Sequence, residues 1–194
     1  MFVKICGLRT AADVTAAASS SADAVGFLFA RSPRQIDPAT ATSLVAVAGG
    51  MLTVGVFKDM PPALVRSIAE STGIGAVQLH GDYSKDAFTE LADPRWQLIR
   101  AVPHAAPDLR VGAYGEDMLL VDAPRAGSGE TWDYGSVAGL DGQWLLAGGL
   151  HPGNVAAAAR AAGAWGVDVS SGVESSRGIK DHGLIADFLA AARP

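Results

Sequence analysis

The sequence predicts a single-domain (β/α)8 barrel, an α/β fold built on a closed parallel sheet. Eight short apolar segments of strand length recur along the 194 residues and alternate with stretches of helical character. Strands that read as unbroken apolar runs are buried on both faces, and their alternation with helices indicates a parallel sheet. Eight units without a clear switch point in strand order favour a closed barrel, with an open doubly wound sheet as the alternative.

The predicted strands are continuous apolar runs, each long enough for one strand of a buried sheet. They cover residues 2–6, 24–29, 52–57, 76–80, 96–102, 118–122, 144–147 and 166–169. The chain is slightly shorter than the roughly 200 residues at which such barrels usually begin, so the connecting loops must be short.

Capping residues and prolines mark the predicted helices. Thr10 and Asp13 form a capping-box pattern, and Pro38 follows Asp37 at a first-turn position, where proline is favoured. The helices cover approximately 10–20, 37–48, 61–71 and 84–91, a segment from 152, and 181–192. Residues 104–115 are weakly helical at best, so the unit after the fifth strand has the least regular pattern.

Composition places the chain among globular proteins with a substantial core. Hydrophobic residues make up 49% of it and charged residues 18%, and no linker or low-complexity segment divides it. The formal net charge is −5 and no run of Lys or Arg is present, which argues against a nucleic-acid partner. We therefore expect one domain without a nucleic-acid partner.

Three further features bear on compartment. The chain has one cysteine, which excludes an internal disulfide framework and a cysteine-based zinc site. It opens directly into a predicted strand, without the basic and apolar regions of a secretory signal. No window approaches 18 unbroken apolar residues, so no membrane-spanning helix is expected. The expected location is the cytoplasm, with neither membrane nor nucleic acid as partner, and the oligomeric state stays open.

Polar residues stand at the ends of several predicted strands, where a parallel barrel places its chemistry. Cys6 ends the first strand, His80 the fourth and Asp122 the sixth. Each has a structural alternative, because most free cysteines are small buried hydrophobes, and a strand-end histidine or aspartate often serves only packing or capping. Convergence on one mouth makes Asp122 a candidate acid and Cys6 a candidate reactive thiol.

Small residues follow the last two predicted strands, with Gly149 after the seventh and Ser171 and Gly172 after the eighth. Bare backbone N–H groups near a helix N-terminus can bind a phosphate, and these two loops are a common place for one in barrels. A glycine pair by itself is often only a turn, so the position in the barrel carries this prediction.

Eight short motifs occur in a fixed order from the first strand to the last helix. They are V-K-I-C-G at 3–7, D-A-V-G-F at 23–27, S-P-R at 32–34, G-V-F at 55–57, V-Q-L-H-G at 77–81, L-V-D at 120–122, G-S-G at 127–129 and G-V-D-V-S-S-G-V-E at 166–174. Together they resemble the signatures of the phosphoribosylanthranilate isomerase family. The resemblance is weakest between residues 104 and 115.

The resemblance implies a (β/α)8 barrel of tryptophan biosynthesis that converts N-(5-phosphoribosyl)anthranilate to its 1-deoxyribulose 5-phosphate isomer. This Amadori rearrangement of a phosphorylated small-molecule substrate would need no metal or organic cofactor. By the same resemblance Asp122 is the general acid for the ring oxygen and Cys6 the general base for the C2 proton. Arg34 would meet the anthranilate carboxylate, and His80 would line the substrate.

These roles set conditions on two pKa values. Asp122 would need a raised pKa to be protonated at neutral pH, and Cys6 a lowered pKa or an induced deprotonation. The resemblance also assigns Gly127 and Gly129 to a substrate-binding loop after the sixth strand. Beyond that loop, Glu130 and the Trp-Asp-Tyr at 132–134 depart mildly from the family's usual Phe-Asp-Trp. We expect this difference to affect the packing of the loop more than the chemistry of the site.

Other barrel proteins fit the residues less well. A histidine-pathway isomerase performs the same chemistry but has an aspartate in place of Cys6, and it is longer with two similar halves. A ribulose-phosphate epimerase needs several metal-binding histidines and acids at strand ends, and a Schiff-base aldolase needs a lysine where the sixth strand has Asp122. A non-catalytic phosphate-binding barrel would have lost the acid or the base, and this chain has both.

One buried ion pair is predicted from strand geometry. Side chains alternate along a strand, so Lys4 points to the same side as Cys6, into the barrel. Asp168 shares a side with Ser170 on the eighth strand, which neighbours the first strand in a closed barrel. Because a buried lysine is rarely unpaired, the sequence predicts a Lys4–Asp168 ion pair beneath the site.

Overall fold

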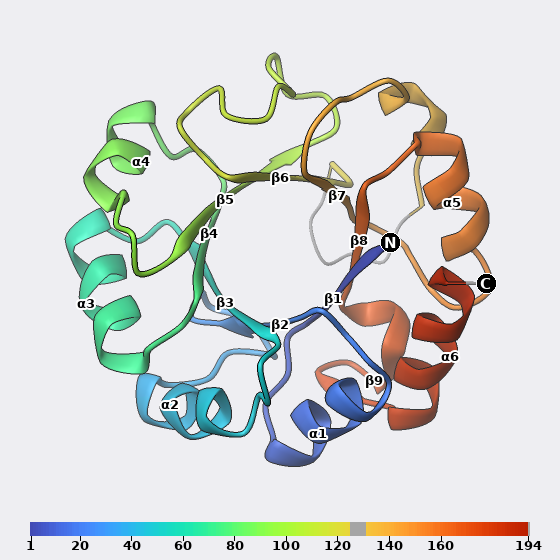
Figure 1. The fold of residues 1–194 in the computed structure, drawn as a ribbon, viewed down its shortest axis with the longest axis horizontal. Coiled ribbons are helices and arrows are strands. Elements are labelled where there is room, and N and C mark those ends of the chain that lie inside the picture. The colour runs from blue at the N-terminus through green and yellow to red at the C-terminus, as the bar shows by residue number, and fades with distance from the viewer. Residues whose placement is uncertain (125–130, 194) are drawn as a thin grey trace.

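The computed structural model describes residues 1–124 and 131–193. Eight parallel strands follow one another in sequence order around a closed barrel, because β1 pairs with both β2 and β8. The predicted fold class is confirmed, and Figure 1 shows the ring of strands with the helices outside it. The strands are β1 Phe2–Cys6, β2 Ala24–Leu28, β3 Leu52–Lys58, β4 Ala76–His80, β5 Gln97–Pro103, β6 Met118–Asp122, β7 Trp144–Leu146 and β8 Gly166–Val169.

Two apolar layers hold the barrel together, one inside the ring of strands and one between the strands and the helices. On β6, for example, Leu119 and Val121 belong to the outer layer, and Met118 and Leu120 to the inner one. Burial on both faces explains why the strands read as unbroken apolar runs rather than as alternating patterns. Asp122 continues the inward series, so its carboxyl is delivered to the end of the barrel.

Six α-helices among the described residues cover the outside of the barrel. α1 begins as predicted, with Thr10 and Asp13 exchanging hydrogen bonds in a complete capping box. The side chains of Asp37, Ser84 and Asp181 each accept a backbone N–H at the start of α2, α4 and α6. The helices are α1 Ala11–Ser19, α2 Pro38–Ala46, α3 Pro62–Thr72, α4 Lys85–Leu91, α5 Val155–Ala162 and α6 His182–Ala192. Within the described part of the chain, no helix has the length and apolar content that a membrane span requires.

The segment between β5 and β6 forms turns rather than a helix. A buried arginine holds it in place of helical packing. Arg100 donates to the carbonyl oxygens of Asp108 and Arg110 at 3.0 and 2.9 Å, and its Nε pairs with Glu116 at 2.7 Å. The segment contains one proline and two glycines within a dozen residues, which explains the absence of a regular helix.

Two connections carry elements that the sequence pattern did not reveal. A short 3-10 helix, η1 at Tyr134–Val137, stands between β6 and β7. After β8 come a second 3-10 helix, η2 at Ser171–Val173, and an antiparallel hairpin of β9 Glu174–Ser176 and β10 Ile179–Lys180. These segments are short and mostly polar, so neither helical nor strand periodicity could be read from them.

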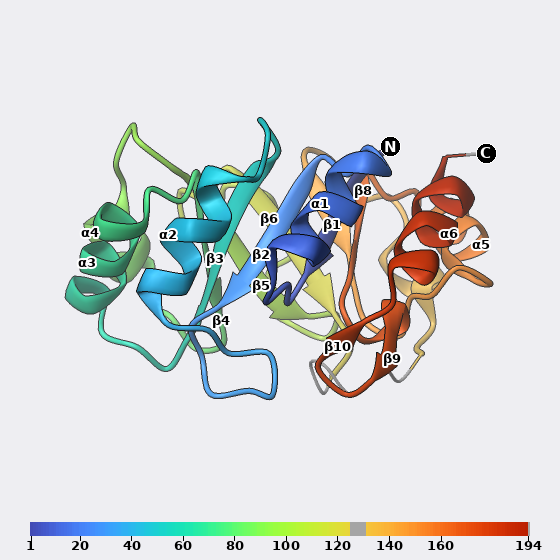
Figure 2. The ribbon, with the colours of Figure 1, turned by 90° about the horizontal axis from the view of Figure 1, so that it is seen from below.

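The carboxyl ends of the barrel strands lie together at one end of the molecule. Figure 2 shows this end at the bottom, where the β9–β10 hairpin also lies, with both chain termini at the top. In parallel barrels this end holds the active site, because the loops that follow the strands meet there.

Candidate active site

The four side chains predicted to act on the substrate meet at the carboxyl end of the barrel. Cys6 from β1, Arg34 from the loop after β2, His80 from β4 and Asp122 from β6 all line one hollow of about 230 Å3. These residues come from strands and loops at different positions around the ring. Closure of the barrel turns their side chains toward a common space.

A smaller hollow of about 50 Å3 adjoins the first, between the loops after β7 and β8. Gly149 and Ser171, which the sequence analysis assigned to a phosphate site, both line it. Asp122, Asp168 and Ser170 line both hollows, so the two form one continuous site.

The predicted Lys4–Asp168 ion pair is confirmed beneath this site. Lys4 Nζ lies 2.7 Å from Asp168 Oδ1, and the Lys4 side chain is completely buried. The two residues are direct neighbours in the pairing of β1 with β8. Burial opposes the charged form, but the Asp168 carboxylate and the Cys6 side chain together outweigh it and raise the pKa of Lys4, so the ammonium is charged at neutral pH.

The Cys6 thiol is buried beside this ammonium. Gly26 faces Cys6 across the β1–β2 pairing, and a Cβ there would come 2.8 Å from Sγ and 3.3 Å from Lys4 Cε. Glycine thus leaves the space that both side chains occupy. Burial raises the pKa of Cys6, while the Lys4 and Lys180 charges oppose the rise. Of the two conditions set for Cys6, a lowered pKa and an induced deprotonation, the raised pKa is compatible with the second.

Asp122 has the raised pKa that its expected role requires. Burial raises it from 3.8 to about 6, and the N–H of Ala123, which donates to Oδ1 at 2.7 Å, only partly opposes this. Gly148 lies directly against the carboxyl, because a Cβ there would come 2.9 Å from Oδ1 and 2.6 Å from the Ala123 nitrogen. The carboxyl is thus fixed in position and readily protonated near neutral pH.

Arg34 lines the hollow, and its guanidinium is bound by Glu174, a residue to which the sequence analysis gave no role. Its Nε and Nη2 donate to the two oxygens of Glu174 at 2.6 and 3.0 Å. Lys180 Nζ donates to the same carboxylate at 2.9 Å. Glu174 closes the G-V-D-V-S-S-G-V-E motif, and that position was the signal that could have pointed to it.

His80 and Gln78 share the inward face of β4, two residues apart. Burial, with the Lys58 charge as the next cause, lowers the pKa of His80, so its imidazole is neutral at pH 7. Gln78 is 3% exposed, lines the larger hollow, and has a buried Oε1 without a hydrogen-bond partner among the described residues. The sequence reasoning missed Gln78, although a polar residue inside an apolar strand could have flagged it.

The loops around the smaller hollow bring backbone rather than charge to the site. Gly149 has a φ of +66°, which favours glycine, and its N–H makes no backbone hydrogen bond with the described residues. Ser171 begins η2, where the first N–H groups have no helical partner. Gly172 does not line the hollow; a Cβ there would overlap the Leu150 carbonyl oxygen at 1.8 Å, so it permits close packing of the two loops. Gly127 and Gly129 lie outside the described residues.

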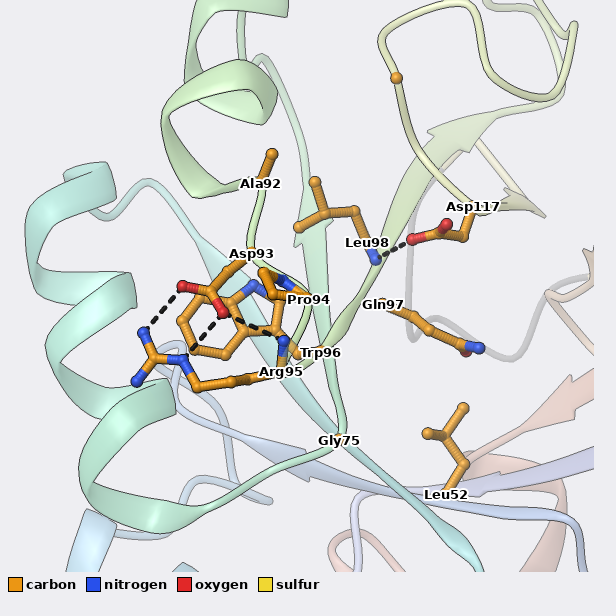
Figure 3. A pocket seen from close by; sticks show the side chains of 11 residues that line it. Leu52, Gly75, Ala92, Asp93, Pro94, Arg95, Trp96, Gln97, Leu98 and Asp117 are labelled. Carbon is orange, nitrogen blue, oxygen red and sulfur yellow. Dashed lines mark hydrogen bonds and ion pairs between the residues drawn. The ribbon is translucent and has the colours of Figure 1, made fainter.

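A larger hollow of about 470 Å3 opens at the opposite end of the barrel, around the start of β5. Figure 3 shows that several of its polar groups are bonded within the hollow: Arg95 pairs with Asp93 at 2.8 Å, and Asp117 accepts the N–H of Leu98 at 2.7 Å. Polar side chains do not converge on its centre as they do at the carboxyl end. In the described residues, no three His, Cys, Asp or Glu side chains are grouped to hold a metal ion.

Fold and site together define a (β/α)8-barrel enzyme whose acid, thiol and arginine meet at the carboxyl mouth. Residues 3–191 match the family model described as N-(5'phosphoribosyl)anthranilate (PRA) isomerase. The N-(5'-phosphoribosyl)anthranilate isomerase of Rhodospirillum rubrum is 42% identical, over 98% of this chain and 97% of its own. The chain belongs to the N-(5'-phosphoribosyl)anthranilate isomerase family, and the enzyme is an isomerase.

Solved structures agree with this membership. TrpF from Jonesia denitrificans is 47% identical and superposes with a TM-score of 0.91, over 100% of this chain and 97% of that one. A phosphoribosyl anthranilate isomerase in complex with reduced 1-(o-carboxyphenylamino)-1-deoxyribulose 5-phosphate is 31% identical, with a TM-score of 0.84, over 100% and 98% of the two chains.

Proposed function

We propose that this isomerase acts on N-(5-phosphoribosyl)anthranilate in tryptophan biosynthesis, with Asp122 as general acid and Cys6 as general base. The observation that carries the proposal is the meeting of these two groups, from β1 and β6, in one hollow. An Amadori rearrangement needs a proton donor at the ring oxygen and a proton acceptor at C2, and two such groups facing one small space satisfy that need.

The first step opens the furanose ring. Asp122 gives its proton to the ring oxygen as the C1–O bond breaks, and the nitrogen lone pair forms the C1=N bond. At pH 7 a carboxyl with a pKa of about 6 is protonated in roughly one molecule in ten, against roughly one in a thousand for an ordinary aspartate. Burial of Asp122 therefore keeps a useful fraction of its carboxyl protonated at pH 7.

The second step removes the proton from C2. The Cys6 thiolate takes this proton, the C–H electrons form C1=C2, and the C1=N electrons return to nitrogen. The resulting enolamine becomes the ketone when C1 gains a proton and the C2 hydroxyl loses one. The Lys4 ammonium stabilises the Cys6 thiolate and partly offsets the rise in the pKa of Cys6 that burial causes.

The two ends of the substrate match the two hollows. The smaller hollow, with the exposed backbone of Gly149 and Ser171, would hold the phosphate. The larger hollow would hold the anthranilate ring, with Arg34 near the carboxylate and neutral His80 along the ring or sugar. Gly127 and Gly129 remain proposed substrate contacts by family resemblance. The oligomeric state is outside the proposal.

Turnover of N-(5-phosphoribosyl)anthranilate by the purified protein tests the proposal, with Cys6→Ser and Asp122→Asn as the decisive variants. General acid–base catalysis contributes about 10²–10⁴-fold per group, so each variant should lose at least about 100-fold in kcat while KM changes little. Arg34→Ala should instead raise KM more than it lowers kcat. Near wild-type kcat in either catalytic variant removes that residue from its role.

The two catalytic variants should also differ from each other. Ring opening has a slow background in water, whereas removal of the C2 proton has no comparable background. Asp122→Asn should therefore be partly rescued by substrate that has opened spontaneously, and Cys6→Ser should exchange no C2 proton with deuterated solvent. Exchange in Cys6→Ser would contradict the assignment of the base.

A further inference from the structure

The β9–β10 hairpin carries two charged residues, Glu174 and Lys180, that the proposed mechanism does not use and that form a buried ion cluster with Arg34 beside the active-site hollow. Glu174 binds Arg34 at two points, 2.6 and 3.0 Å, and also accepts from Lys180 Nζ at 2.9 Å and from the N–H of Gly178 at 3.0 Å. The side chains of Arg34, Glu174 and Lys180 are only 7%, 4% and 1% exposed. A cluster this buried is a fixed part of the fold, unlike a surface ion pair.

Lys180 also reaches the other half of the site. Its Nζ donates to the carbonyl oxygen of Ser170 at 2.7 Å and lies 3.3 Å from the Ser170 hydroxyl. Ser170 lines both hollows, and Ser171 follows it in the smaller one. A continuous chain of contacts therefore joins Arg34 in the larger hollow to the wall of the smaller one.

Two glycines allow the close packing that holds this chain of contacts in place. A Cβ at Gly7 would come 2.7 Å from Arg34 Cδ and 3.1 Å from the Ser170 hydroxyl. Gly178, with a φ of +84°, presses against the loop before Arg34, because a Cβ there would come 3.0 Å from the carbonyl oxygen of Pro33. The arginine stem and the hairpin thus have little freedom to move relative to each other.

The cluster holds two cations against one carboxylate. Arg34 and Lys180 share Glu174, which leaves one positive charge in excess in a site that excludes most water. Unmatched buried charge is unfavourable, so the arrangement favours an anion in the neighbouring hollow. The cluster therefore serves binding of an anionic ligand as well as the fold.

We propose that Glu174 and Lys180 are positioning residues, which fix the Arg34 guanidinium and the Ser170–Ser171 segment at a set separation. We call Arg34, Glu174, Lys180 and Ser170 the brace. The inference rests on the proposed function, in which Arg34 receives the substrate carboxylate and the Ser171 segment its phosphate. The brace would thus select substrates in which the carboxylate and the phosphate are separated by the distance between Arg34 and the Ser171 segment.

A double-mutant cycle tests the Glu174 half of the brace. Loss of a residue that orients a ligand-binding group typically weakens function by about 10–100-fold, so Glu174→Gln should raise KM by at least about tenfold, with a smaller change in kcat. Added to Arg34→Ala, the same change should raise KM by less than about twofold, because Glu174 acts through Arg34. Independent effects of the two changes on KM would overturn the inference.

A matched control separates positioning from loss of stability. Glu116 pairs with Arg100 at 2.7 Å, with side-chain exposures of 0% and 5%, near the opposite end of the barrel. Glu116→Gln should lower Tm as Glu174→Gln does, yet leave KM within about twofold of wild type. Should Glu174→Gln fail to fold, Glu174→Asp keeps the charge one methylene shorter and should still raise KM. An equal rise in KM in Glu116→Gln, or no rise in the folded Glu174 variant, would overturn the inference.

Calorimetric titration with inorganic phosphate tests the Lys180 half without turnover. Lys180→Met should weaken phosphate binding by about tenfold or more, and Lys180→Arg should largely restore it, because a cation again reaches Ser170. Unchanged affinity in Lys180→Met, or no binding by the wild type, would overturn this half. Wild-type protein that shows these phosphate effects without turning over phosphoribosylanthranilate would contradict the proposed function and leave the brace standing.

Discussion

At the scale of single residues, Asp122 shows how burial shifts the protonation of a carboxyl and weakens the fold at neutral pH. It is 8% exposed and lies at the carboxyl end of β6. Burial removes water from the charged form of its carboxyl and raises its pKa from 3.8 to about 6. The Lys4 and Asp168 charges act on the pKa values of both Cys6 and Asp122, so charge in this site is set by neighbours as much as by identity.

The raised pKa of Asp122 predicts a pH-dependent loss of stability. Because the folded state holds this proton more tightly than the unfolded state, the contribution is present below about pH 4 and is lost as pH rises through 6. A pKa difference of about 2 corresponds to roughly 3 kcal/mol. Asp122→Asn should therefore be more stable than wild type by up to about 3 kcal/mol at pH 7.5 and equally stable near pH 4. Urea unfolding from pH 4 to 8 measures this, and a difference that does not vary with pH would contradict it.

The pH dependence of kcat/KM should report both catalytic groups. In the proposed mechanism the active form has Asp122 protonated and Cys6 ionised, the reverse of the order in which the two groups titrate. The value of kcat/KM should therefore rise with pH up to about 6 and stay level through neutrality. It should fall only at a pH above the ordinary thiol pKa of about 8.5, because burial raises the pKa of Cys6.

The control for this profile is Asp122→Asn, because the substrate phosphate also titrates near pH 6. The residual activity of the variant depends on the thiolate alone, so it should continue to rise across the level region. A level region that persists in Asp122→Asn would show that the lower limb does not belong to Asp122.

At the scale of elements, the loops after β6, β7 and β8 meet by backbone contact. Gly148 adopts a φ of +84° and touches the Asp122 carboxyl, and Gly172 lies against the Leu150 carbonyl. Among the described residues no helix follows β5, and only the short 3-10 helix η1 follows β6. On that side the barrel is therefore covered by turns and η1. Local backbone geometry therefore shapes the part of the site where the loops after β6, β7 and β8 meet.

Gly148→Ala should damage catalysis and stability together. The added methyl would come 2.6 Å from the Ala123 nitrogen and 2.9 Å from Asp122 Oδ1, and the positive φ disfavours alanine. We expect kcat to fall by about tenfold or more as Asp122 shifts, with a loss of roughly 1–3 kcal/mol in unfolding free energy. Steady-state kinetics and urea unfolding measure the two effects.

Gly163→Ala is the matched control for Gly148→Ala. Gly163 ends α5 with a φ of +64°, and a Cβ there meets nothing within 4 Å. Its substitution should lower stability by roughly 1 kcal/mol through backbone conformation alone and leave kcat unchanged. A kcat in Gly148→Ala as high as in Gly163→Ala would show that Gly148 does not position Asp122.

At the scale of the whole molecule, closure joins the two ends of the chain. β1 and β8 pair over four register positions, although some 160 residues separate them. Every barrel strand has a partner on both sides, and both apolar layers run around the ring. Removal of any strand would leave two open edges and expose both layers, so partial unfolding is strongly disfavoured.

We therefore predict that the chain unfolds as one domain. Trp96, Trp132, Trp144 and Trp165 lie on different strands and loops of the barrel, so their fluorescence reports on much of the ring. Urea curves followed by tryptophan fluorescence and by far-ultraviolet circular dichroism should coincide. Two separated transitions would contradict the single-domain assignment.

The sequence by itself determined the parts that follow from local pattern and alternation. Predominantly apolar runs located all eight strands, because burial on both faces leaves only a few polar positions within them, such as Lys4, Gln78 and Arg100. Strand-end positions identified Cys6, His80 and Asp122, since parallel strands deliver their carboxyl ends to one mouth. Two-residue alternation together with closure was enough to predict the Lys4–Asp168 pair.

Only the tertiary structure decided the features that depend on contacts between distant segments. The Arg34–Glu174 pair joins residues 140 positions apart through a hairpin with no readable periodicity. The pKa of Cys6 depends on the balance between burial and neighbouring ammonium groups, which no spacing encodes. The role of Gly148 follows from a backbone approach of less than 3 Å. Such features are set by how loops pack in three dimensions, whereas strand burial leaves its mark directly on the order of the residues.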